Sequence, residues 1–147
     1  MECSKVNKSF KAIGVKGYGK YEDFEDLVPK TAREFLMRRE EFLNAADTEI
    51  ALYEPKKDAG HIEGQFFVGL IVNETPEVIP SQMEYIEESG GYVTTRGNIK
   101  EISSLHQRLT KWSEESGYER DTGAFIVETY HPLPNGEEEV EIYWPII

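Results

Sequence analysis

The chain has 147 residues, a formal net charge of −12 at pH 7 and 39% hydrophobic residues, among them 17 aromatic ones. This length fits one domain or a duplicated half-sized unit, and the hydrophobic content can fill a core. No apolar run approaches the ~18 residues of a membrane-spanning helix. The first ten residues lack the apolar stretch of a secretory signal. The single cysteine, Cys3, excludes a disulfide framework. Together these features predict a cytoplasmic protein without a membrane partner.

The negative charge is concentrated in the second half of the chain. Residues 1–75 hold 11 Lys and Arg against 14 Asp and Glu, whereas residues 76–147 hold 5 against 14. Binding to a nucleic-acid backbone requires a basic surface, and neither half supplies one. We therefore expect no direct contact with nucleic acid.

The first half reads as strand, helix, strand, strand. Residues 9–16 are typical of a strand, ended by a turn at Gly17-Tyr18-Gly19. A helix is expected from Glu25, with Pro29 near its start, because apolar residues recur at three- and four-residue spacing. That stripe comprises Leu27, Val28, Ala32, Phe35, Leu36, Phe42 and Leu43. After a break over 44–47, strands are expected over 49–53 and 65–72, and the proline-containing residues 74–80 read as a linker.

The second half repeats this order. A strand is expected within residues 83–95, best placed over 91–95, and ends at Arg96-Gly97-Asn98. The helix that follows ends at Gly117, and its apolar stripe is Ile99, Ile102, Leu105, Leu109 and Trp112. Strands are expected over 124–130 and 140–147, joined by a hairpin turn at Asn135-Gly136.

Two local similarities support a duplication. The segment from Ile50 to Pro55 resembles the segment from Val127 to Pro132 at a spacing of 77 residues, and Phe35 and Trp112 are also 77 apart. The sequence therefore predicts two βαββ repeats in one domain, over about residues 9–73 and 83–147, with residues 74–82 as the linker.

Over about residues 9–147 the order of motifs resembles the GyrI-like small-molecule-binding domain, also called the bacterial effector-binding domain. The segment LVPKTAREFLMRREEF is similar to the family's proline-started helix. The second half is more similar: Gly91-Tyr92-Val93, Gly97, a helix bearing Trp112, then Gly117, Glu128-Thr129-Tyr130 and the terminal Tyr143-Trp144-Pro145-Ile146.

The resemblance implies an α+β fold of two βαββ units related by a pseudo-twofold axis. It further implies helices on one face of the sheets and an aromatic cleft between the halves. Transcription factors of the family carry a DNA-binding segment before this domain, and none precedes it in this sequence. We therefore expect a stand-alone member of the family.

Glu128 is the most informative candidate site residue, because it interrupts the apolar run from Ala124 to Tyr130. An unpaired carboxylate in an apolar environment is costly. Strand alternation, with Phe125 and Val127 taken as core, predicts that Glu128, Tyr130 and Tyr143 share a concave face. In the family, a Glu at this place meets the charge of lipophilic cations, and a Tyr at the place of Tyr143 lines the same site.

Further aromatic residues are candidates for the same pocket. Tyr53 occupies the position of Tyr130 in the other repeat. The remaining candidates lie at strand ends, on a strand of uncertain parity, or on the second helix: Tyr18, Tyr92, Phe67 and Trp112. An aromatic cage attracts a cation through the quadrupoles of its rings, and a carboxylate supplies the counter-charge.

The sequence predicts no metal and no cofactor. His61, His106 and His131 lack metal-ligand spacing, no serine sits in a nucleophile motif, and no glycine-rich phosphate loop is present. We expect a protein that sequesters or senses hydrophobic, cationic or aromatic small molecules. Three alternatives stay open: a hydrolase of electrophilic xenobiotics using Glu128 and Tyr143, a gyrase-inhibitor-like role with a protein partner, and, more distantly, haem binding.

Overall fold

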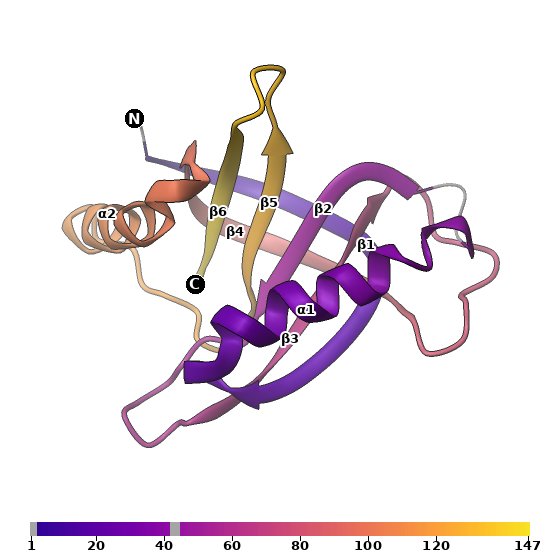
Figure 1. Cartoon of the computed structure of the whole chain (residues 1–147). Coiled ribbons are helices and arrows are strands. Elements are labelled where there is room, and N and C mark those ends of the chain that lie inside the picture. The colour runs from indigo at the N-terminus through magenta and orange to yellow at the C-terminus, as the bar shows by residue number, and fades with distance from the viewer. Residues whose placement is uncertain (1–2, 42–44) are drawn as a thin grey trace.

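The computed structural model describes residues 3–41 and 45–147, except for the side chains of residues 45–47. Each half contains a strand, a helix and two further strands, which confirms the α+β class and the predicted element order (Figure 1). The elements are β1 (Ser4–Lys20), α1 (Phe24–Leu36), β2 (Ala45–Tyr53), β3 (Glu63–Val72), β4 (Glu84–Asn98), α2 (Ile102–Glu115), β5 (Ile126–Pro132) and β6 (Glu138–Ile146). Short 3₁₀ turns, Tyr21–Asp23 and Ile99–Glu101, lead into the two helices.

The six strands close into an antiparallel barrel in the order β1-β3-β2-β5-β6-β4. The long strand β1 joins the halves, because residues 12–20 pair with β3 and residues 4–14 pair with β4. On the opposite side, β2 pairs with β5. Side chains from all six of these strands fill the barrel with one buried cluster: Phe10, Ala12, Ile50, Leu52, Phe67, Tyr92, Val127 and Tyr143.

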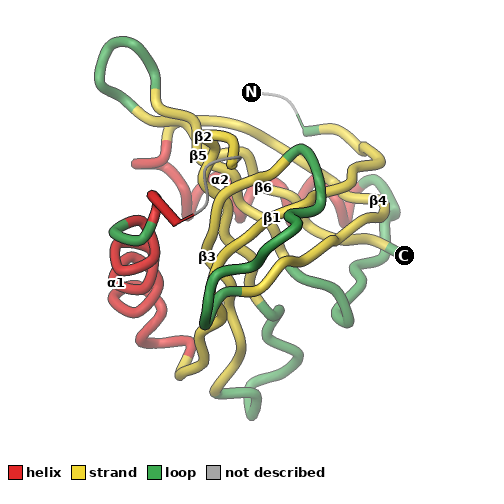
Figure 2. The backbone as a smooth tube through the Cα atoms, turned by 90° about the vertical axis from the view of Figure 1, so that its right-hand side faces the viewer, coloured by secondary structure: helices red, strands yellow, loops and turns green. Residues whose placement is uncertain are grey.

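Both helices pack against the outside of the barrel (Figures 1 and 2). Helix α1 contacts β1 and β3, and α2 contacts β4 and β6, so each helix covers strands of its own repeat. Leu105 and Leu109 of α2 are fully buried against Val93 and Ile142. Strands β2 and β5 therefore lie between the two helices. Within the described ranges, no helix has the length and apolar character needed to cross a membrane.

Strands β1 and β4 are longer than the sequence analysis predicts. Gly17, Tyr18 and Gly19 continue β1 instead of forming a turn, and Arg96, Gly97 and Asn98 continue β4. The reason in β1 is close packing: a Cβ atom on Gly17 would lie 2.1 Å from the Phe66 ring. Glycine inside a strand marks close approach as well as turns, and here it marks close approach.

The predicted ends of α2 and of the last hairpin are confirmed. Gly117 follows α2 with a φ of +80°, and the amide of Tyr118 donates to the carbonyl of Ser113, as in a Schellman cap. Gly136 turns the β5–β6 hairpin with a φ of +86°. In the first half, α1 ends at Leu36, and β2 already begins at Ala45, within the expected break. Residues 42–44, which include the last two residues of the expected stripe, lie outside the described residues.

Candidate ligand-binding site

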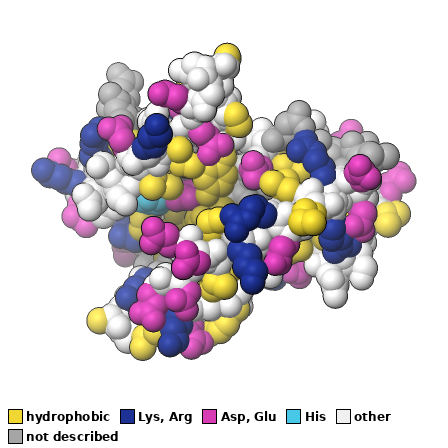
Figure 3. Space-filling model, in the orientation of Figure 1, with side chains coloured by type: hydrophobic (Ala, Val, Ile, Leu, Met, Phe, Trp, Pro, Cys, Tyr) yellow, Lys and Arg dark blue, Asp and Glu magenta, His cyan; other side chains and the backbone are white. Residues whose placement is uncertain are grey.

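A cavity of 420 Å³ lies between α1, the strands beneath it and the start of α2. Both halves of the chain line it, which agrees with the expected cleft between them. Figure 3 shows this face, where hydrophobic side chains surround a hollow and acidic side chains stand near its rim. The lining is mostly apolar and includes Phe24, Val28, Pro29, Ala32, Phe35, Leu36, Ile50, Ala51, Val68, Ile99 and Ile102.

The cavity exists because α1 packs over β1 and β3 and leaves β2 and β5 less covered. Val28 and Phe35 of the predicted stripe are buried against the barrel, yet they also border the cavity. On β2, Ala51 is the small residue beside Glu128, with which it pairs across the β2–β5 ladder. The apolar stripe of α1 therefore serves both the core and the site.

Glu128 lines the cavity from β5 and is only 5% exposed. The Tyr130 hydroxyl donates to Glu128 Oε1 at 2.6 Å, and His106 Nε2 lies 2.7 Å from Glu128 Oε2. These two contacts satisfy one lone pair on each carboxylate oxygen, which makes burial of the group tolerable.

The two tyrosines that are 77 residues apart meet beside this carboxylate. The hydroxyl of Tyr53 is 3.2 Å from that of Tyr130. Because Tyr130 gives its proton to Glu128, Tyr53 is the donor in this pair. Burial and then the charge of Glu128 raise the pKa of Tyr53. Burial, the neighbouring Tyr53 and Glu128 raise the pKa of Tyr130. Both tyrosines therefore stay uncharged.

The site is rich in carboxylates. Glu25, Glu49 and Glu138 line the same cavity as Glu128, and no lysine or arginine of the described chain is among its lining residues. Burial and the neighbouring Glu138 raise the pKa of Glu49. A side cavity of 330 Å³ shares Phe24, Glu25, Tyr53, Ile102 and Glu128 with the main one and adds Ser103, His106 and Ile126. The polar side of both cavities is negative.

The structure brings together three of the predicted site residues and separates the other five. Glu128, Tyr130 and Tyr53 line the main cavity. Tyr143, Phe67 and Tyr92 point into the barrel, Trp112 packs against Tyr118 beside α2, and Tyr18 is 62% exposed on β1. None of these five lines the cavity.

The predicted shared face of Glu128 and Tyr143 is wrong. Across the β5–β6 ladder, Glu128 pairs with Ile142 and Val127 pairs with Tyr143, so Tyr143 lies on the face opposite Glu128. Both faces of these strands are buried, one inside the barrel and one beneath α2, and alternation alone could not assign them. Tyr143 donates to Glu141 at 2.7 Å, so the Glu128–Tyr143 pair of the hydrolase alternative is not formed.

Sequence reasoning missed two residues of the site. His106 lacks metal-ligand spacing, and its place in the predicted second helix gives no sign of a contact with β5. Phe24 precedes the expected start of the helix at Glu25, yet it is the first residue of α1 and borders both cavities. The approach of α2 to β5 depends on the barrel, which local periodicity does not describe.

Comparisons with known proteins agree with this fold. The family model described as Cass2, integron-associated effector binding protein, matches residues 6–146. The fold is similar to an integron cassette protein from Vibrio cholerae, at 13% identity and a TM-score of 0.68, covering 99% of this chain and 95% of that one. No curated protein sequence matched this chain.

Two other solved structures share the fold. One is SAV2435 bound to tetraphenylphosphonium, at 12% identity and a TM-score of 0.73, covering 100% of this chain and 94% of that one. The other is a hydrolase from Listeria innocua, at 14% identity and a TM-score of 0.61, covering 99% and 92%.

Fold and cavity thus define an effector-binding domain, which confirms the GyrI-like resemblance. Since the family model spans nearly its whole length, the chain belongs to the Cass2 family of integron-associated effector-binding proteins.

Proposed function

We propose that this protein binds hydrophobic organic cations in the main cavity, with Glu128 as the counter-charge, and so sequesters or senses them. The carrying observation is a carboxylate, 5% exposed, that faces a largely apolar cavity lined by both repeats. Hydrocarbon walls favour apolar groups of a ligand, and a cation replaces water as the partner of the carboxylate.

Three observations support a cation over a neutral or anionic ligand. Three further carboxylates line the cavity: Glu25, Glu49 and Glu138. Among the described residues, no basic side chain lines it. The rings of Phe24 and Tyr53 border the cavity and can attract a cation through their faces. SAV2435, which shares this fold, has been solved bound to tetraphenylphosphonium, a cation whose charged phosphorus carries four phenyl groups.

Calorimetric titration with tetraphenylphosphonium and with tetraphenylborate tests the proposal, because the two ions share a shape and differ in charge. We expect micromolar affinity for the cation, equal to about −8 kcal/mol, and none measurable for the anion. The variant Glu128→Gln should weaken the cation roughly tenfold to a hundredfold, since a charge-assisted contact contributes about 1.5–3 kcal/mol.

The control is Glu88→Gln, the same change at a half-buried carboxylate that lines neither cavity. It should leave the affinity unchanged. Equal affinity for both ions, or unchanged cation affinity in Glu128→Gln, would contradict the proposal. Turnover of an electrophilic xenobiotic that disappears in Glu128→Gln, with binding retained, would support the hydrolase alternative instead.

A further inference from the structure

Trp144 lies outside both cavities, yet its indole bonds to the side chain that contacts Glu128. Trp144 Nε1 is 3.0 Å from His106 Nδ1, and His106 Nε2 is 2.7 Å from Glu128 Oε2. A chain of two hydrogen bonds thus runs from β6 through α2 to the carboxylate on β5.

The direction of both hydrogen bonds follows from the chemistry of the groups. An indole N–H can only donate, so His106 Nδ1 accepts and carries no proton. An imidazole keeps at least one ring proton, which must then be on Nε2 and is donated to Glu128. His106 is therefore neutral in this arrangement.

The neutral ring matters for the charge of the site. Both donors to Glu128, the imidazole Nε2–H and the Tyr130 hydroxyl, are uncharged, so neither places a positive charge beside the carboxylate. A protonated His106 would form an ion pair with Glu128 and cancel that charge. It would also direct an Nδ1–H at the indole N–H of Trp144.

Further charged groups lie near this chain of hydrogen bonds. Glu25 of α1 borders the side cavity with His106, and the Arg120 guanidinium stacks on the Trp144 ring at 3.8 Å. We propose that Trp144 is a positioning residue that holds His106 in its neutral, Nε2-protonated form and so keeps the charge of Glu128 free for a cationic ligand. The effect on cation binding rests on the proposed function, whereas the protonation state of the His106 ring does not.

The state of the ring can be measured without any ligand. Long-range ¹H–¹⁵N spectra of protein labelled with ¹⁵N-histidine report which ring nitrogens carry protons, and His106→Gln assigns the signals. At pH 6 and pH 8 we expect His106 to be protonated at Nε2 alone. A ring protonated at Nδ1, or at both nitrogens, would overturn the inference even if tetraphenylphosphonium binds.

Trp144→Phe tests the consequence, because it keeps an aromatic ring and removes the donor. An unrestrained histidine is about three-quarters protonated at pH 6, so tetraphenylphosphonium affinity should fall about fourfold or more at pH 6 and recover at pH 8. The double variant His106→Gln/Trp144→Phe, which has no ring to protonate, should lose this dependence on pH. Trp112→Phe, on the same helix as His106 but without a contact to it, is the matched control.

Unchanged affinity of Trp144→Phe at pH 6 would overturn the inference. So would a loss that persists at pH 8 and in the double variant, since that would indicate a packing role. If the wild type does not bind tetraphenylphosphonium, the proposed function fails, while the spectra still decide the state of His106. The spectra also decide it if Trp144→Phe does not fold.

Discussion

At the scale of single residues, the site depends on how one buried carboxylate is satisfied. Glu128 accepts hydrogen bonds from Tyr130 and His106. Each of these donors is itself held by a second hydrogen bond, Tyr130 by Tyr53 and His106 by Trp144. The identity of Glu128 as the central residue could be predicted from the sequence, because a charge inside an apolar strand is conspicuous. Its partner His106 could not, because the two residues are 22 positions apart and lie on two different elements, α2 and β5.

Tyr130→Phe and Tyr53→Phe remove one hydroxyl each and form a matched pair. Tyr130 donates to a carboxylate at 2.6 Å, whereas Tyr53 donates to the neutral hydroxyl of Tyr130 at 3.2 Å. We expect Tyr130→Phe to lower the free energy of unfolding by about 1.5–3 kcal/mol and Tyr53→Phe by about 0.5–1.5 kcal/mol. Urea denaturation measures both, and an equal or reversed order would contradict the assigned direction of these bonds.

At the scale of elements, the strand ends were the least predictable feature. The sequence predicts turns at Gly17 and Gly97, yet both residues lie inside long strands. The sequence shows only that a glycine is present, whereas its role depends on Phe66, which is far away in the chain and covers Gly17 in space. The turns at Gly117 and Gly136 were predictable, because their left-handed φ and their bonding partners are local.

Gly17→Ala should destabilise the protein, because its Cβ would meet the Phe66 ring between β1 and α1. Crowding a packed interior in this way costs about 1–3 kcal/mol. Gly90→Ala is the control: it is also a strand glycine, and a Cβ there would meet nothing within 4 Å. Thermal denaturation should show a lower midpoint for Gly17→Ala only. Equal midpoints for the two variants would indicate that Gly17 does not serve close packing.

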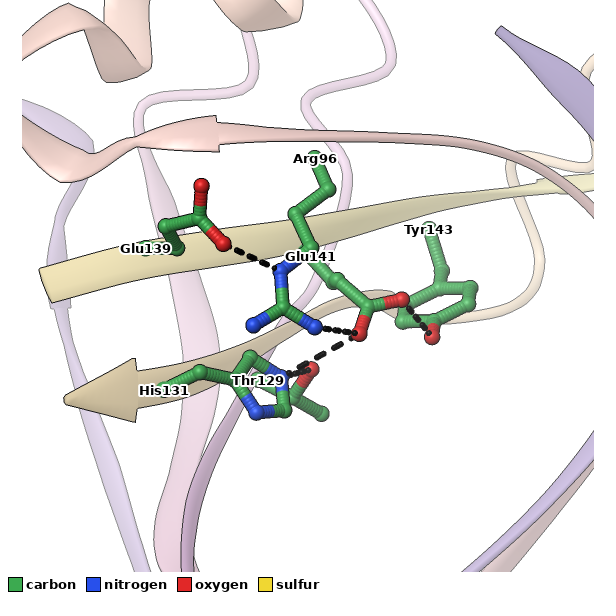
Figure 4. Close-up of polar contacts among 6 residues, drawn as sticks. All are labelled: Arg96, Thr129, His131, Glu139, Glu141 and Tyr143. Atoms are coloured by element: carbon green, nitrogen blue, oxygen red, sulfur yellow. Dashed lines mark hydrogen bonds and ion pairs between the residues drawn. The ribbon is translucent and has the colours of Figure 1, made fainter. Parts of the chain in front are cut away.

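A polar cluster joins β4, β5 and β6 on the barrel face opposite Glu128 (Figure 4). Arg96 bonds Glu139 at 2.8 Å and Glu141 at 3.0 Å, and Thr129 Oγ1 lies 2.8 Å from His131 Nε2. Burial, and then the charge of Arg96, lower the pKa of His131, although Glu141 opposes this shift. The cluster therefore holds a histidine that resists protonation.

His131 should make stability depend on pH in a defined direction. Because its pKa is lowered in the folded state, the unfolded chain binds more protons as the pH falls through the ordinary histidine range, near 6.5. The wild type should therefore lose stability relative to His131→Gln between about pH 7.5 and 5.5. Urea denaturation across this range measures the difference, and parallel curves or the opposite slope would show that His131 is not shifted as stated.

At the scale of the whole molecule, the duplication explains why a single site arises between two similar halves. Ala51 and Glu128 are 77 residues apart, as are Tyr53 and Tyr130. Ala51 and Glu128 pair directly between β2 and β5, so equivalent positions of the two halves meet at the site. A glutamate at both positions would place two like charges side by side. Alanine on one side, 1% exposed, leaves one carboxylate and room beside it.

The α+β class, the duplication and the element order could be predicted, because each repeat carries its own local pattern. Closure of the six strands into a barrel could not, because it depends on β1 pairing with both β3 and β4. That closure creates a buried interior, and Tyr143, Phe67 and Tyr92 lie inside it and away from the cavity. The repeat boundaries at residues 73 and 83 stay a prediction, which superposition of the halves would check.

Ligand binding should protect both halves of the molecule, because α1 and β2 come from the first repeat and β5 and the start of α2 from the second. At a tetraphenylphosphonium concentration of 100 times the Kd, the folded state gains about 2.7 kcal/mol. Hydrogen exchange followed by mass spectrometry should therefore show slower exchange in peptides from α1 and from β5. Glu128→Gln at the same cation concentration should show much less protection. Slower exchange in one repeat alone would contradict a site shared between the halves.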